Sequence, residues 1–414
     1  MENTVNSPVI TGIKDALNRV ISGGPVYLFL LTAFVILLIA GVISGIYSIF
    51  IAGTLHSYGT FREIPLALLI ATYIFFVVAS TGLCLVSSIG HVFGNRDFLP
   101  IAKRSVLLAL ITIISGFLVI ALEIENPFRM LIYFFTSPNF SSNIWWMGAL
   151  YMLYMIFMAI EFVLLMRESH RVAAFFGFLS VISGVAAHSN LGGIFAMLHG
   201  RDIWYGPFLP VYFILSAMMT GSAFIIFFSI IAQKIRNTKM DEAEEKSLAL
   251  VGKLAMLMIA AIVFLTVWKL ITMTTGGETH LLTLHETISG SHAFSFWVLE
   301  VACGMIIPFF LLWRSSGRKR GLMMTAAALM IFSIFFMRLD LVIMAQIVPL
   351  YWDLGVKEFS QLHTYAPTWK EILVALGGVG FCGAAFMLGE KVFNGFSEAP
   401  GIEDLESGKA ESEL

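Results

Sequence analysis

The sequence predicts an all-α integral membrane protein with ten transmembrane helices. Hydrophobic residues make up 58% of the 414 residues, charged residues only 13%, and the mean hydropathy is +0.88. These values lie far from those of soluble domains. The apolar residues are gathered into ten runs, each near the ~20 residues that a helix needs to cross a bilayer. Lysine and arginine are abundant in alternate loops, as expected for a chain that crosses a membrane repeatedly.

The ten runs define the expected spans, and aromatic residues gather at their edges, as at a membrane interface. Trp145, Trp146, Trp204 and Tyr205 are examples. Pro308 interrupts the eighth span. We expect spans at residues 26–52, 64–89, 102–123, 144–166, 173–197, 206–232, 250–275, 293–313, 321–347 and 371–391.

The basic residues predict which side of the membrane each loop occupies. Eighteen of the 25 lysines and arginines fall in the two tails and the loops after even-numbered spans, five fall in the other loops, and two lie inside spans. Positive charge favours the cytoplasm, so both termini are expected there, in a bacterial inner (cytoplasmic) membrane protein. Residues 1–25 are expected to form a cytoplasmic amphipathic segment, 26–60 the first span and its loop, and 393–414 an acidic, disordered tail.

Composition and motifs exclude several classes of function. A net charge of −2, without a basic stripe, gives no sign of nucleic-acid binding. Three isolated cysteines, Cys84, Cys303 and Cys382, form no CxxC, CxxCH or zinc spacing. We therefore expect no iron–sulfur cluster, c-type haem or metal site in this chain. His56 and His188 could be haem b ligands in principle, but the spans offer no convincing pair of facing histidines.

Four ionisable residues are expected inside spans seven to nine. Lys269, Glu300 and Arg338 share one depth, roughly 10 Å inside the outer boundary at ~1.5 Å per residue, and Asp340 lies close by. Each costs ~2.5–3.5 kcal/mol there, so they should face one another rather than lipid. A structural ion-pair cluster and a proton or ion relay both fit this pattern. Glu161, deeper in span four, could be a further proton carrier or could pair with Arg167.

Seven of the nine histidines fall at or near the outer face, together with Glu63, Glu123, Glu125 and Arg129. Imidazoles tolerate membrane interfaces, so any one histidine is weak evidence. The group indicates a working outer surface, which could bind a ligand, a proton or another protein.

Several segments resemble one known family when they are taken as an ordered set. They are "GLCLVSSIGHVFG" (82–94), "EIENPFRMLIYFFTSPNFSSNIWWMGALY" (123–151), "AHSNLGG" (187–193) and "DIWYGPFLPVYFILSAMMTG" (202–221). The chain resembles the NrfD/PsrC family of polysulfide-reductase-like membrane subunits over residues 60 to 230. "MRLDLVIMAQIVPLYW" (337–352) and "YAPTWKEILVALGGVG" (365–380) resemble its ten-span members. Among these, the membrane subunit of the menaquinone reductase complexes of sulfate reducers is the most similar.

This resemblance implies NrfD-like four-helix bundles, the first within residues 61–235 and a second, with the last span, within 236–392. A quinone pocket is implied near the outer face of the first, with polar positions at Tyr73, Glu125 and His188. Known members carry histidine at the first position and tyrosine at the third, so the pair is exchanged here. Arg129 could tune Glu125, His56 is a further candidate quinone contact, and Asn126-Pro127 is expected to end span three.

The function that the resemblance implies is exchange of electrons between menaquinone and partners on the periplasmic side. Those partners are an iron–sulfur subunit, a multihaem cytochrome c and a molybdopterin-oxidoreductase-like subunit. Menaquinone reduction is favoured, with Glu125 and His188 as catalytic candidates. Protons could pass through Glu161 or through the charges of spans seven to nine. A quinol-oxidising anchor, as in alternative complex III, remains open, as do a secondary transporter and an inert structural anchor.

Overall fold

The ten expected spans are helices in the part of the chain that the structure describes. This computed structural model describes residues 18–201, 203–236, 240–350, 352 and 361–393. The spans are α2 (Pro25–Tyr47) continued by η1 (Ser48–Ala52), α4 (Leu68–His91), η2 (Arg96–Phe98) with α5 (Leu99–Ala121), α7 (Asn143–Met166), α8 (His170–Ala196), α9 (Phe208–Arg236), α10 (Glu242–Thr274), η3 (Ser295–Ile306) with α12 (Ile307–Ser315), α13 (Arg320–Met344) and α14 (Trp369–Val392). Three short helices lie between them: α3 (Thr54–Ser57), α6 (Pro127–Thr136) and α11 (Glu278–Ile288).

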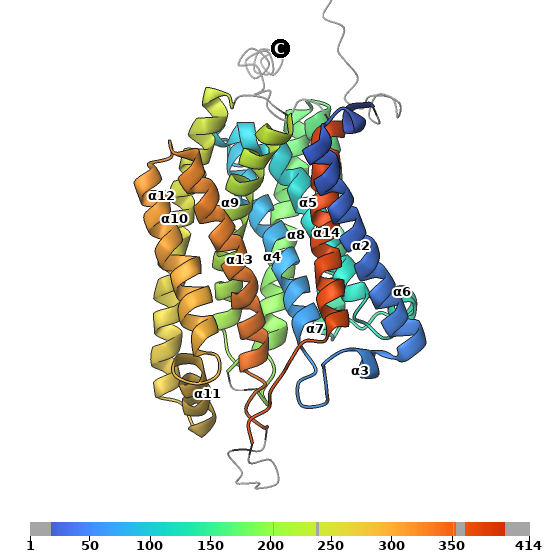
Figure 1. The fold of residues 1–414 in the computed structure, drawn as a ribbon, viewed down its shortest axis with the longest axis vertical. Coiled ribbons are helices and arrows are strands. Elements are labelled where there is room, and N and C mark those ends of the chain that lie inside the picture. The colour runs from blue at the N-terminus through green and yellow to red at the C-terminus, as the bar shows by residue number, and fades with distance from the viewer. Residues whose placement is uncertain (1–17, 202, 237–239, 351, 353–360, 394–414) are drawn as a thin grey trace, which may run out of the picture.

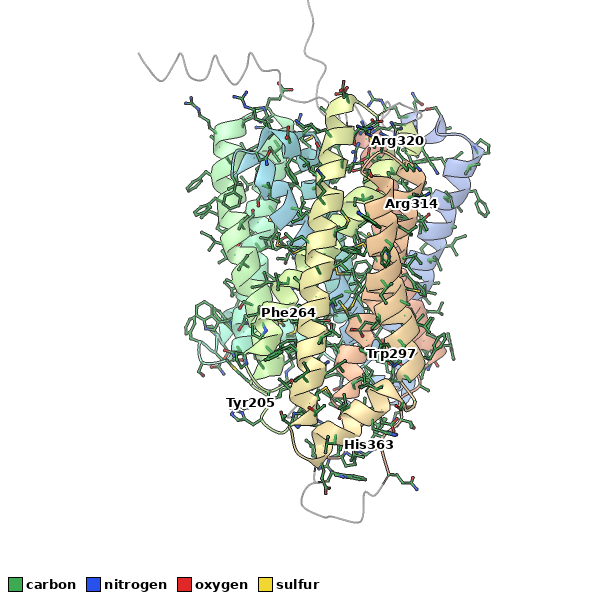
Figure 2. All side chains as sticks on the ribbon, turned by 90° about the vertical axis from the view of Figure 1, so that its left-hand side faces the viewer. Tyr205, Phe264, Trp297, Arg314, Arg320 and His363 are labelled. Carbon is green, nitrogen blue, oxygen red and sulfur yellow. The ribbon has the colours of Figure 1, made fainter. Side chains whose placement is uncertain are left out.

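The spans stand side by side, and the short helices gather at one end (Figure 1). The start of α2 and the end of α14 lie together at the other end, where Arg314 and Arg320 also lie (Figure 2). We call the end with α3, α6 and α11 the outer end and its opposite the inner end, after the orientation that the basic residues predict. Residues 1–17 of the expected amphipathic segment and residues 394–414 of the expected acidic tail lie outside the described residues.

The helices form two adjoining groups. The first bundle consists of α4, α5, α7 and α8. The second consists of α9, α10, α13 and the η3–α12 span. Helix α9 also packs along α4 and α8, so it belongs to both. Helices α2 and α14 pack on one another, and α14 also packs against α5, so the last span lies beside the first bundle.

The two bundles meet where α4 crosses α9. A Cβ atom at Gly82 would lie 1.8 Å from the Ala217 carbonyl oxygen, and one at Gly221 would lie 2.1 Å from the Gly82 carbonyl carbon. Only glycine allows backbones this close, a common feature of membrane helix crossings. Both helices also place a tyrosine at the same distance before a Thr-Gly pair, Tyr73 before Gly82 and Tyr212 before Gly221. The bundles therefore share a short repeat at their contact.

Proline positions explain two local features. Asn126 and Pro127 begin α6, whereas α5 already ends at Ala121, so the expectation that this pair ends span three was wrong. Proline suits the first position of a helix, where its missing N–H has no partner to lose. Pro308 follows the π-helical segment η3 and lies in the first turn of α12, so the eighth span continues past it with a change of winding.

Candidate functional site

A polar cluster lies inside the first bundle, made by residues of α4, α7 and α8. The Tyr151 hydroxyl lies 3.4 Å from His188 Nδ1. The Phe117 ring packs edge-on between Tyr73 and Tyr151, with centroids 6.0 Å from each. His188 and Tyr151 are fully buried, and Tyr73 is buried apart from 4% of its surface. The structure thus brings together two of the residues expected at the quinone site, Tyr73 and His188, and adds Tyr151.

The second nitrogen of His188 makes no well-aligned hydrogen bond among the described residues, although the Phe213 backbone lies near the imidazole. Nε2 is buried without a hydrogen bond, and the imidazole centroid lies 5.6 Å from that of Phe213. A buried polar atom left unpaired costs ~1–3 kcal/mol, so such atoms usually mark a missing partner. The site therefore offers one unused hydrogen-bonding position inside an apolar bundle, which suits the carbonyl of an apolar ring compound.

Polar residues continue from this cluster towards the inner end of the bundle. The Tyr154 hydroxyl donates to the Ser80 carbonyl oxygen at 3.0 Å and lies 3.0 Å from Ser80 Oγ. Further along, His91 Nε2 lies 2.7 Å from Glu161 Oε1, and both side chains are almost completely buried. Glu161 therefore pairs with His91 rather than with Arg167, the partner considered from the sequence.

The surroundings of His91 fix where its protons lie. Its Nδ1 lies 3.0 Å from the Ser87 carbonyl oxygen, which can only accept, so Nδ1 carries a hydrogen. The Nε2–Oε1 distance is short, but the hydrogen-bonding direction of Nε2 does not point at the carboxyl oxygen. The pair is therefore a close contact between an imidazole and a carboxyl group, buried inside the first bundle.

Arg338 lies where the two bundles meet. It is completely buried, and its Nη2 donates to Ser216 Oγ at 2.5 Å. Its guanidinium carbon lies 5.1 Å from the Phe213 centroid and 5.8 Å from that of Tyr212, which is cation–π distance. Nε and Nη1 have no hydrogen-bond partner among the described residues. The Phe213 ring thus lies near both the His188 imidazole and the Arg338 guanidinium, and it links the two bundles.

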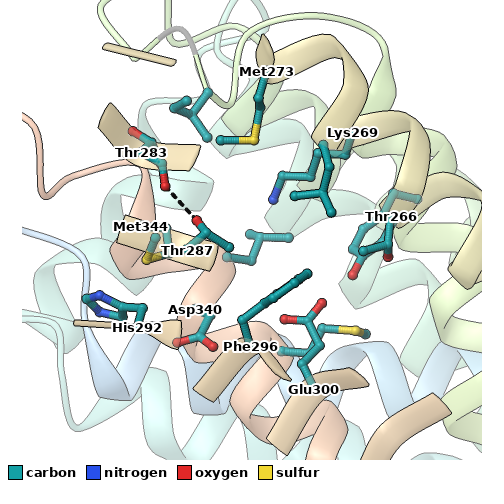
Figure 3. A pocket seen from close by; sticks show the side chains of 15 residues that line it. Thr266, Lys269, Met273, Thr283, Thr287, His292, Phe296, Glu300, Asp340 and Met344 are labelled. Atoms are coloured by element: carbon teal, nitrogen blue, oxygen red, sulfur yellow. Dashed lines mark hydrogen bonds between the residues drawn. The ribbon is translucent and has the colours of Figure 1, made fainter. Parts of the chain in front are cut away.

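The other expected intramembrane charges surround a cavity of about 40 Å³ in the second bundle. Lys269, Glu300 and Asp340 line it, together with His292 and several threonines (Figure 3). The Ser295 hydroxyl donates to Asp340 Oδ2 at 2.5 Å. A space of this size and polarity holds a few water molecules. The structure therefore brings three of the four predicted charges to one cavity, with Arg338 behind it.

These charges do not form the direct ion pairs that a purely structural cluster would show. Among the described residues, no carboxylate oxygen of Glu300 or Asp340 lies within 4.0 Å of a Lys269 or Arg338 nitrogen. Charges this deep need compensation, which water in the cavity can supply. The arrangement is therefore a small cavity lined by separated charges rather than a set of direct ion pairs.

The outer segment of Glu123, Glu125 and Arg129 is arranged differently from the expectation. Glu125 lies before α6 and is exposed, so it shares no helical face with Arg129. Arg129 is exposed as well and lies 5.3 Å from the Tyr133 ring centroid. His56 is exposed on α3. None of these three joins the cluster around His188 in the described structure.

Glu123 is the carboxylate of this segment with an unusual environment. Burial and the neighbouring Glu371 carboxylate raise the pKa of Glu123 to about 7. Glu371 is itself held by the backbone N–H groups of Gly59 and Thr368 and by the Tyr365 hydroxyl, at 2.8–2.9 Å. Glu123 thus lies beside the fixed Glu371 carboxylate at the outer end of the molecule. Its raised pKa lets it gain or lose a proton near neutral pH.

Sequence reasoning missed Tyr151, Tyr154 and His91. All three belong to a buried face of their helix, and Tyr151, Tyr154, Met158 and Glu161 recur at helical spacing along α7. That spacing was the available signal, because it places both tyrosines on the same face as the buried Glu161.

The fold and these sites define a polytopic helical membrane protein with buried polar sites in two bundles. No group of three or more His, Cys, Asp or Glu residues in the described part of the chain is arranged to hold a metal ion. The family model of polysulphide reductase, NrfD, matches residues 56–349, and the chain belongs to this family.

Three relatives are each about a quarter identical to this chain over the aligned residues. A selenate reductase subunit of Mesobacillus selenatarsenatis is 25% identical over 75% of this chain and 81% of its own length. The Hdr-like menaquinol oxidoreductase integral membrane subunit of Archaeoglobus fulgidus is 24% identical over 87% and 92%. A putative dimethyl sulfoxide reductase membrane subunit of Halobacterium salinarum is 26% identical over 78% and 81%.

Proposed function

We propose that this chain is the quinone-interacting membrane subunit of a respiratory oxidoreductase complex. The family supports this, because a relative that covers most of the chain is named as a subunit of a menaquinol oxidoreductase. The observation that carries the proposal is the buried His188 imidazole, whose Nδ1 lies beside the Tyr151 hydroxyl and whose Nε2 makes no hydrogen bond. Menaquinone is the substrate that we propose, with its ring between Tyr73, Tyr151 and His188.

The protein's part in the reaction is to bind, orient and protonate. Quinone reduction takes two electrons and two protons, and the quinone carries the redox chemistry. When Tyr151 donates to His188 Nδ1, Nε2 carries the hydrogen and donates to a carbonyl oxygen of the ring. Tyr73 is placed to contact the ring through its hydroxyl. Electrons come from partners at the outer end: an iron–sulfur subunit, a multihaem cytochrome c and a molybdopterin-oxidoreductase-like subunit.

Protons for this site have a route from the inner end. The His91–Glu161 pair lies there, and Tyr154 with Ser80 lies between that pair and Tyr151. The second-bundle cavity of Lys269, Glu300 and Asp340 is a separate polar site. Tyr212 lines it and lies beside Arg338, which in turn lies beside Phe213. We propose that both belong to a proton path that makes turnover electrogenic. Glu125 and Arg129 are then contacts of the outer surface.

We propose menaquinone reduction as the physiological direction, from the resemblance to menaquinone reductase complexes. A quinol-oxidising complex would use the same residues in the opposite order. Isolation of the native complex distinguishes these roles from a lone transporter or an inert anchor. We expect redox subunits at the outer end and electron transfer to menaquinone. A chain that purifies alone and moves a solute would contradict the proposal.

Binding of a menaquinone analogue to the purified chain tests the site. His188→Ala should weaken binding at least about tenfold, and Tyr151→Phe by about threefold to tenfold, since a hydrogen bond is worth ~0.5–1.5 kcal/mol. The matched controls are His199→Ala and Tyr205→Phe, whose side chains are exposed at the outer end. Quenching of intrinsic fluorescence gives the dissociation constants. Unchanged binding in His188→Ala would exclude this site.

A further inference from the structure

An apolar groove on the flank of the molecule is not used by the proposed quinone chemistry. It has a volume of about 420 Å³ and lies between α2, α13 and α14, with α4 and α9 as its floor. We call it the flank groove. Aromatic rings dominate its lining, including Phe34, Phe75, Phe228, Phe335 and Phe386.

The flank groove extends over about half the thickness of a membrane. On α9 its lining runs from Phe224 to Ile235, about 16 Å at 1.5 Å per residue, against ~30 Å for the hydrocarbon core. On α14 it runs from Val379 to Met387. Ile235 and Met387 lie close to the inner ends of their helices, at Arg236 and Val392. The groove therefore spans the leaflet at the inner end.

The length and the apolar lining of the flank groove indicate which kind of molecule can bind in it. Apolar walls give water no partners, and an empty apolar cavity destabilises a protein in proportion to its volume. A transmembrane helix of a partner would need a groove that crosses both leaflets, about 30 Å long. A hydrocarbon chain that enters from one leaflet matches the length and the polarity.

Positive charge lies at the inner mouth of the groove. Lys391 is one helical turn beyond Met387, on the same face of α14, and its Nζ lies 5.5 Å from the Tyr27 ring centroid. The Tyr27 hydroxyl donates to the Met387 carbonyl oxygen at 3.0 Å, which holds the start of α2 beside this mouth. Lys234 is exposed in the last turn of α9. Lysines at this depth attract anionic headgroups.

We propose that the flank groove binds one acyl chain of an anionic phospholipid from the inner-end leaflet, with its phosphate beside Lys391. The chain fills the space between α13 of the second bundle and the α2–α14 pair. The lipid thus contacts α13 on one side and α2 and α14 on the other. It is a tightly bound structural lipid of the subunit and does not exchange freely with the surrounding bilayer.

Native mass spectrometry of the full chain in mild detergent tests this proposal. Delipidated chain is offered phosphatidylglycerol, phosphatidylcholine or menaquinone in turn. We expect one retained phosphatidylglycerol per chain. Val379→Phe and Ile331→Phe fill the groove from opposite walls, and each should lower the bound fraction at least about fivefold. Lys391→Gln should reduce the preference for phosphatidylglycerol over phosphatidylcholine about fivefold, the effect of one lysine near an anionic surface.

The matched control is Ile372→Phe, which adds an aromatic ring to the exposed face of α14 outside the groove and should leave the bound fraction unchanged. Because the two filling substitutions lie on different helices, a folding defect in one leaves the other informative. Equal lipid retention by both filled variants would overturn the groove as the site. Equal retention of the two phospholipids by the wild-type chain, or retention of menaquinone in their place, would overturn the anionic phospholipid as its occupant.

Discussion

Tyr73, Tyr151 and His188 show what single residues contribute to the proposed quinone site. The family resemblance predicted Tyr73 and His188, and ring packing through Phe117 brings them into one cluster. Tyr151 could not be singled out, because it lies in an aromatic-rich span where most rings simply pack. Glu125 followed from a motif, yet its side chain is exposed, since the chain turns between α5 and α6 just where that motif lies.

Glu123 provides a pH-dependent prediction at this scale. Its pKa in the folded protein is about 7, raised by burial and by Glu371 from an ordinary value of 4.5. A raised carboxyl pKa means that the folded state binds more protons than the unfolded state between these values. Folding stability should therefore fall as pH rises from about 4.5 to 7 and level off above that.

Glu123→Gln should remove this part of the pH dependence and raise stability at pH 8 by ~1–3 kcal/mol, since one pKa unit is worth ~1.4 kcal/mol. Thermal unfolding of the detergent-solubilised chain at pH 5 and pH 8 measures it. Glu125→Gln is the control and should behave as wild type, because Glu125 is exposed. A pH profile unchanged by Glu123→Gln would contradict the assignment.

At the scale of helices, the sequence predicted the spans well and their packing poorly. All ten spans lie where the apolar runs were expected, because bilayer thickness fixes the length of each run. The pairing of α14 with α2 was not predictable, since every span is apolar and many faces are equivalent in composition. In the sequence, the crossing of α4 and α9 corresponds to Gly82 and Gly221, each preceded at the same distance by a tyrosine. This pattern could be interpreted only once the contact was known.

That crossing predicts the cost of one added methyl group. Gly82→Ala would place Cβ against the Ala217 carbonyl, a backbone atom that cannot move aside cheaply. Overpacking usually costs ~1–3 kcal/mol, and this substitution should reach the upper end of that range or prevent insertion. Gly193→Ala in α8 is the control, because nothing lies within 4 Å of its Cβ position. Thermal unfolding and membrane yield compare the two, and equal stability would show that α4 and α9 do not cross this closely.

At the scale of the molecule, two helix bundles each enclose a polar site. The first holds the cluster of Tyr73, Tyr151 and His188, and the second holds Lys269, Glu300 and Asp340 around a cavity of about 40 Å³. Phe213 contacts both His188 and Arg338, so it joins the two sites across the bundle contact. The depth of the intramembrane charges was predictable from the sequence, because helical rise converts residue number into depth. Their separation by a cavity was not, because it depends on how the helices pack.

The second-bundle cavity predicts how charge movement depends on its carboxylates. In proteoliposomes of the whole complex, Glu300→Gln and Asp340→Asn should each reduce transmembrane charge movement at least about tenfold, since a positioned proton carrier contributes ~10²–10⁴-fold. Quinone turnover should persist under uncoupled conditions. Glu278→Gln, exposed in α11, is the control. Full charge movement in both variants would remove this cavity from the proton path.

The position of the quinone itself is the most direct test of the proposed function. A photoreactive menaquinone analogue, bound to the purified complex and irradiated, labels the peptides that surround its ring. We predict labelled peptides from α4, α7 and α8 that contain Tyr73, Tyr151 or His188, and loss of that label in His188→Ala. Labelling confined to the second bundle or the flank groove, with none in the first bundle, would contradict this account.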